Sequence, residues 1–181
     1  MAFLSVLSFV AFGLAMPQVP ALQQQPSVGS PLEYQVKAAY ILNLVNLTEW
    51  PAAALGPSSN PFRVCVLGAD SFRSVMENTV RGESVHGHPI VVERSTGDPD
   101  QNCQVLFVST RNADAAAELL RTLGPAPVLT IGEADGFLRA GGVVRFVVDQ
   151  GHVRFDVNRV TAEHHGLTLS SRLLRVARSV Q

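Results

Sequence analysis

The chain has 181 residues with a net charge of −1, of which 16% are charged and 46% hydrophobic. This composition suits one globular domain with an apolar core. Non-specific nucleic-acid binding requires a basic surplus, so the balanced charge argues against a nucleic-acid partner. Lysine occurs once, at Lys37, in no Gly-Lys-Ser/Thr sequence, which argues against a P-loop and a Schiff-base enzyme. We expect Lys37 to be exposed on the first helix.

The N-terminus has the features of an export signal. A thirteen-residue apolar stretch runs from Phe3 to Ala15, which is short for a membrane span and typical of a secretory signal. Cleavage after Ala15 or Ala21 would follow a small residue. No Lys or Arg precedes the stretch, so an uncleaved membrane anchor is the alternative. The domain organisation that we predict is a signal peptide at 1–21, a disordered tether at 22–32 and an α/β domain at 33–181.

The first predicted helix has a clear start and stop. Ser30 can cap it, Pro31 suits its first position and Glu33 can complete a capping box. Apolar residues then recur at helical spacing until Trp50-Pro51, where proline disfavours a helical residue before it.

The remaining pattern alternates strands with helices. We expect strands at 62–68, 88–93, 103–109 and 128–131. We expect Asp70 to cap a helix that runs to about Val80, and a further helix to run from Asn112 to Leu123. A hairpin of strands 143–148 and 152–157 is predicted about Asp149-Gln150-Gly151, followed by a last helix at 172–180. Alternating strands and helices predict a mostly parallel sheet covered on both faces. The fold class is therefore α/β, a single-domain three-layer sandwich, with the antiparallel hairpin at one edge.

No catalytic motif is recognisable, and we expect neither enzymatic activity nor a cofactor. The chain lacks a Gly-x-Ser-x-Gly elbow, a glycine-rich phosphate loop and a Cys-x-x-Cys pair. A response regulator needs a phosphorylatable Asp where the strand 103–109 ends, but Ser109-Thr110 stand there. His86 and His88, or His164 and His165, could ligate a metal only with a third ligand, so bonds to backbone groups or to solvent are the simpler interpretation.

Three arginines and no acid mark the last predicted helix. Arg172, Arg175 and Arg178 could form a solvated face that complements the helix C-terminal dipole. The functional alternative is a docking stripe for an acidic partner or an anionic ligand, because arginine binds carboxylates and phosphates bidentately.

Two cysteines, Cys65 and Cys103, lie on the first and third strands. In the doubly wound order 2-1-3 these strands are neighbours, so a disulfide is geometrically possible. An exported protein would favour the disulfide, whereas the cytosol would favour two thiols. The bridge would be either a structural staple or a redox-sensitive one.

The ordered series of segments resembles the YfiR family of periplasmic regulators over about residues 33–179. The matching segments are Val36-Lys37-Ala38-Ala39-Tyr40, Glu49-Trp50-Pro51, Cys65-Val66-Leu67-Gly68, Gly87-His88-Pro89-Ile90, Cys103 to Ser109, Pro127 to Ile131, Gly136-Phe137 with Gly141-Gly142, Val153 to Asn158 and Ser170 to Arg178.

The resemblance implies a periplasmic homodimer that binds the periplasmic domain of an inner-membrane diguanylate cyclase and inhibits it, with consequences for cyclic di-GMP signalling and biofilm growth. It also implies redox tuning through Cys65 and Cys103, which fall where a family cysteine pair lies; the second pair of some members is missing here. The alternative is a periplasmic small-ligand binding or sensor protein, with a crevice near Gly68 and Ser109. An unrecognised hydrolase is a third, weaker reading.

Overall fold

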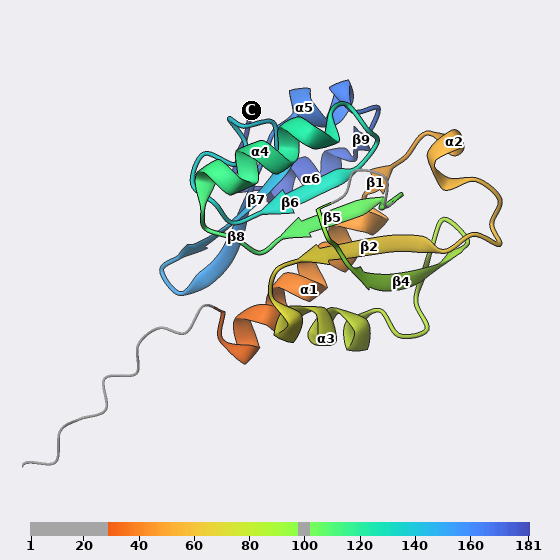
Figure 1. The fold of residues 1–181 in the computed structure, drawn as a ribbon, viewed down its shortest axis with the longest axis horizontal. Coiled ribbons are helices and arrows are strands. Elements are labelled where there is room, and N and C mark those ends of the chain that lie inside the picture. Colours follow the sequence, from red (N-terminus) through yellow and green to blue (C-terminus); the bar gives the residue numbers. More distant parts are fainter. Residues whose placement is uncertain (1–28, 98–101) are drawn as a thin grey trace, which may run out of the picture.

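The computed structural model describes residues 29–97 and 102–181 and shows one α/β domain (Figure 1). The helices are α1 (Pro31–Asn46), α2 (Ala52–Leu55), α3 (Asp70–Thr79), α4 (Ala113–Leu123), α5 (Arg159–His164) and α6 (Ser171–Val176). The strands are β1 (Thr48–Glu49), β2 (Phe62–Leu67), β3 (Ser84–Val85), β4 (His88–Arg94), β5 (Val105–Val108), β6 (Leu129–Gly132), β7 (Val144–Asp149), β8 (His152–Val157), β9 (Thr168–Leu169) and β10 (Ser179–Val180).

The predicted signal peptide at 1–21 and the predicted tether as far as residue 28 lie outside the described residues. The helix α1 begins at Pro31, two residues before the domain boundary that we place at 33. Among the described residues, no helix combines the length and the apolar character needed to cross a bilayer.

The central sheet has the strand order β10-β8-β7-β6-β5-β2-β4-β3. The strands from β4 through β2, β5 and β6 to β7 are parallel, and β7 and β8 form the antiparallel hairpin. This arrangement confirms the predicted fold class. It also confirms that the predicted strands 62–68 and 103–109, which are β2 and β5, are neighbours. The hairpin does not form the edge, however, because β10 pairs in parallel with β8 outside it.

Helices cover both faces of the sheet and create two apolar clusters. On one face, α1, α3 and α6 pack through side chains such as Ile41, Phe72 and Leu173 against the strands. On the other face, α4 packs through Leu119 and Leu120, together with the segment that follows β6. Figure 1 shows α4 in front of β5 and β6 and α1 and α3 along the opposite side.

Local chemistry explains where the helices begin. Ser30 Oγ accepts a hydrogen bond from Glu33 N at 3.1 Å, so the predicted N-cap of α1 is confirmed. The Glu33 carboxylate instead accepts a hydrogen bond from Lys37. Asn112 caps α4 by accepting from Ala115 N at 3.0 Å. At α3 the cap position is Ala69, so the expectation that Asp70 caps this helix is wrong. Asp70 is the first helical residue, where its negative charge interacts favourably with the helix dipole.

Phe137 lies between two glycines on the α4 side of the sheet. A Cβ atom added at Gly132 would come within 2.3 Å of the Phe137 ring, and one added at Gly142 within 2.2 Å. Phe137 is almost completely buried. Glycine at positions 132 and 142 therefore has a packing reason, since any side chain there would displace the Phe137 ring.

Candidate binding site

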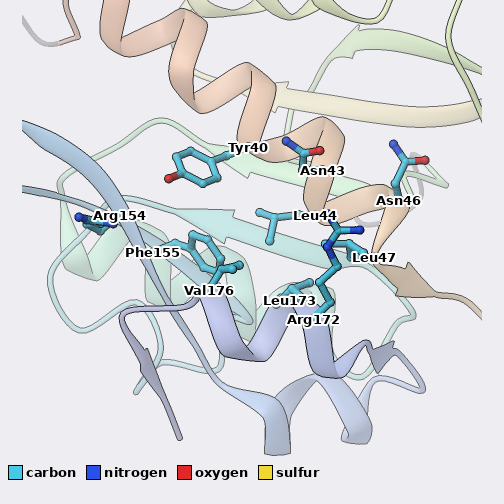
Figure 2. Close-up of a pocket in the computed structure, with 10 residues that line it drawn as sticks. All are labelled: Tyr40, Asn43, Leu44, Asn46, Leu47, Arg154, Phe155, Arg172, Leu173 and Val176. Carbon is cyan, nitrogen blue, oxygen red and sulfur yellow. The ribbon is translucent and has the colours of Figure 1, made fainter.

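A cavity of about 540 Å³ lies between α1, β8 and α6 (Figure 2). The short antiparallel pair β1–β9 ties the end of α1 to the start of α6, with Thr48 opposite Leu169. Ser170 N donates to Leu47 O at 3.0 Å, and Ser170 Oγ caps α6 by accepting from Leu173 N at 3.2 Å. The backbone therefore holds α6 in place along α1, with the cavity between the two helices.

The floor of the cavity is apolar. Leu44, Phe155 and Leu173 line it, and each is buried in the main core. Tyr40 completes the floor, with its ring 5.6 Å from that of Phe155 in an edge-on arrangement. A ligand in this cavity would therefore contact a rigid part of the core.

The rim of the cavity carries mostly polar side chains and one exposed apolar side chain. Asn43, Asn46 and Arg172 lie on it, and Asn46 Nδ2 donates to Leu42 O at 3.0 Å. Val176, which is 61% exposed, lies on the same side. In Figure 2 Arg172 occupies the end near Leu47, and Arg154 occupies the end near Phe155.

The three arginines that we predict as a docking stripe have different surroundings. Arg172 lines the cavity, and Arg175 is exposed on α6. The helix ends at Val176 rather than 180, because the chain becomes extended at Ala177 and forms β10 beside β8. Arg178 therefore lies beyond the helix, and a role for all three in partner binding stays a prediction.

Arg178 is held by an acid from the neighbouring strand. Its Nε and Nη2 donate to the two carboxylate oxygens of Asp156 at 2.8 and 2.5 Å, and Ser179 Oγ donates to Asp156 Oδ1 at 2.8 Å. The hydrogen bond from Arg178 holds the pKa of Asp156 below its usual value, against the opposing effect of burial. Among the predicted arginines, Arg178 is thus the one whose charge is already satisfied.

Cys65 and Cys103 form a disulfide. Cys65 is completely buried in β2, Cys103 lies just before β5, and their Cα atoms are 5.9 Å apart. The bridge joins two adjacent inner strands of the sheet, β2 and β5, on the face covered by α4. It therefore reinforces the middle of the sheet.

At the predicted crevice, the backbone at Gly68 lies close to that at Ser109. A Cβ at Gly68 would come within 2.9 Å of Ser109 O, and the φ of +105° is one that glycine adopts most easily. The two strand ends therefore approach closely at this point.

His86 and His88 bond to backbone carbonyl groups. His86 Nε2 lies 3.0 Å from Thr48 O, and His88 Nδ1 lies 2.9 Å from Asn60 O. The described residues contain no group of three His, Cys, Asp or Glu side chains arranged to hold a metal ion. Burial next to His164 lowers the pKa of His165.

Lys37 is buried, so the expectation that it is exposed is wrong. Its side chain is 3% exposed and donates to both Glu33 and Glu133. A second cavity of about 310 Å³, with Arg111 and Arg145 among its lining residues, lies beside this cluster. Sequence reasoning missed the cluster because Glu133 belongs to the loop after β6, and only the lack of other lysines marked Lys37 as unusual.

Comparisons with known proteins identify the family. A conserved domain protein of Vibrio cholerae has a similar fold, with a TM-score of 0.55 at 13% identity, covering 82% of this chain. This chain spans 60% of that protein, and at this identity the likeness concerns the fold alone. No curated protein matches the sequence. The YfiR/HmsC-like family, whose members are periplasmic regulators, matches residues 34–178. The chain belongs to the YfiR/HmsC-like family.

Proposed function

We propose that this protein is a periplasmic regulator that binds the periplasmic domain of a membrane-bound sensor, a diguanylate cyclase, and inhibits it. Release of the sensor would raise cyclic di-GMP and favour biofilm growth. The protein acts by binding, as a homodimer, and without a cofactor. Family membership over residues 34–178 is the observation that carries this proposal.

Unpaired charge on α6 supports a docking role. Seven arginines of the described chain form ion pairs with acids, and Arg172 and Arg175 are among the six that have no acidic partner there. Both side chains are exposed and belong to one short helix. An acidic surface on the sensor domain would complement these cations, and complementary charge favours fast and specific association.

The decisive experiment follows cyclic di-GMP in the bacterium that carries the gene. Deletion should raise the cyclic di-GMP level, and the wild-type gene on a plasmid should lower it again. Crosslinking in the envelope, with and without reductant, followed by mass spectrometry should identify a membrane protein with a diguanylate cyclase output domain. An unchanged cyclic di-GMP level after deletion would contradict the proposal, as would crosslinking to proteins that all lack this output domain.

A further inference from the structure

The charged side chains that line the cavity beside α6 are all positive. Its lining includes Arg154 and Arg172 but no Asp or Glu. Neither arginine forms an ion pair within the part of the chain that the structure describes. A cationic or zwitterionic ligand would find no counter-charge for its amine here, whereas a carboxylate or a phosphate would find a guanidinium.

Arg172 is the principal cation of the cavity. On β8 Arg154 alternates with the inward-facing Phe155, so its side chain leaves from the other face of the strand. Arg172 precedes the buried Leu173 on α6 and lies at the end of the cavity near Leu47 (Figure 2). Asn43, also on the rim, has no side-chain hydrogen bond among the described residues and supplies a further donor.

The apolar space continues away from Arg172. A neighbouring cavity of about 650 Å³ shares Tyr40 and Arg154 with the first and runs along α1 to Leu32 and Val148. Leu32 is 69% and Val148 55% exposed, which is high for large aliphatic side chains. Glu33 lines this far part, so an anionic head is favoured at the Arg172 end and an apolar body towards Leu32.

We infer that this groove binds an amphipathic anion, with its carboxylate or phosphate head at Arg172 and its apolar chain along α1. Each cavity falls within the usual size of small-molecule sites, about 300–1,000 Å³. The elongated shape favours a chain over a compact ring system. Binding itself is independent of the function proposed above, and only its regulatory consequence, competition with the sensor at α6, rests on that function.

The test uses decanoate and decanol as probes, below their aggregation concentrations, with the protein purified from the periplasm. Isothermal titration calorimetry should show that decanoate binds more tightly than decanol. Arg172→Gln should weaken decanoate binding about fivefold or more and leave decanol unchanged, because a hydrogen bond to a charged group is lost. Arg175→Gln removes the same charge from the same helix but outside the cavity, so its affinity for decanoate should stay within about twofold of that of wild type.

Three results would overturn the inference: no decanoate binding, decanol binding as tightly as decanoate, or equal weakening by the two variants. Vesicles that contain phosphatidylglycerol then distinguish the source of the anion. Cosedimentation that depends on Arg172 and not on Arg175 would indicate a membrane lipid. Decanoate binding without such cosedimentation would indicate a free amphiphile, and either source supports the site. Failure of these titrations would leave the cyclic di-GMP experiment unaffected, so the two proposals can fail separately.

Discussion

Lys37 is ion-paired with Glu133, which lies 96 residues further along the sequence. Glu33, one turn earlier on α1, contacts the same ammonium group. The cluster joins the first helix to the loop after β6 through the single lysine of the chain. Because two carboxylates share one cation in a mostly buried place, removal of the cation should be costly.

We expect Lys37→Met to lower the free energy of unfolding by about 3–5 kcal/mol, since it leaves the two carboxylates without a counter-charge. Urea unfolding, followed by the fluorescence of the single tryptophan, Trp50, measures the loss. Neutralising the acids as well, in Lys37→Met/Glu33→Gln/Glu133→Gln, should recover much of it. The control is Arg121→Met, which breaks an exposed pair with Glu118 and should cost less than about 1 kcal/mol. A Lys37→Met loss as small as that of the control would contradict the prediction.

Arg178→Gln should make the free energy of unfolding less dependent on pH in the acidic range. The hydrogen bond from Arg178 lowers the pKa of Asp156 in the folded protein. Because this pKa is lower in the folded protein, the ionised Asp156 stabilises the fold at pH values above its unfolded pKa of about 3.9. This contribution is lost as the pH falls through the folded pKa. The variant should therefore be less stable than wild type at neutral pH, and the two should converge below about pH 4. Urea unfolding over this pH range checks the convergence, and a constant difference at every pH would refute it.

Arg172→Glu/Arg175→Glu should weaken inhibition of the sensor while the circular dichroism stays unchanged. Both residues are exposed on α6, so reversal of their charge should repel an acidic partner without disturbing the core. Arg81→Glu/Arg139→Glu changes the net charge equally at two exposed arginines outside α6 and serves as the control. The cyclic di-GMP level in complemented deletion strains reports inhibition. Equal inhibition by the α6 variant and wild type would leave these arginines as a solvated face.

Removal of the disulfide should destabilise the protein by about 4 kcal/mol, from the entropy of a loop whose ends are 38 residues apart. Reduced wild type and Cys65→Ala/Cys103→Ala are compared by thermal melting, because the alanine variant also removes buried sulfur atoms. Thiol labelling under denaturant should find no free thiol in periplasmic protein. If the reduced protein melts at the same temperature as the oxidised protein, the bridge adds no stability. If the reduced protein melts at a lower temperature and still inhibits the sensor, the bridge is structural and not regulatory.

The mature protein should begin between residues 16 and 22, because the small residues Ala15 and Ala21 lie at and after the end of the apolar stretch that begins at Phe3. Intact-mass measurement of the protein from fractionated cells gives the new N-terminus. A full-length species in the cytosol would refute export, and a full-length species in the membrane would indicate the anchor instead.

Local patterns predicted most of the long elements. The Ser30 cap and the turn at Asp149-Gln150-Gly151 each act through neighbouring residues, and the structure confirms both. The strands β1 and β9 were not predicted because two-residue strands have no periodicity. The helix α5 was also missed.

The errors concern residues whose environment is set by distant parts of the chain. Lys37 was expected at the surface because the pattern of α1 says nothing about Glu133. The last helix was predicted too long because Arg178 N donates to Phe155 O, and this pairing with β8 outweighs a helical continuation. The cavity combines residues of α1, β8 and α6, of which sequence reasoning had singled out Arg172 alone.

The covalent link between β2 and β5 also bears on how the protein is made. Cys65 and Cys103 are the only cysteines of the sequence. Only one intramolecular disulfide can therefore form, and no non-native intramolecular pairing competes with it. Formation of this bond would then need an oxidant but no disulfide isomerase. Because the bond closes the chain around α3 and β4, a single proteolytic cut between residues 65 and 103 would leave both fragments covalently joined.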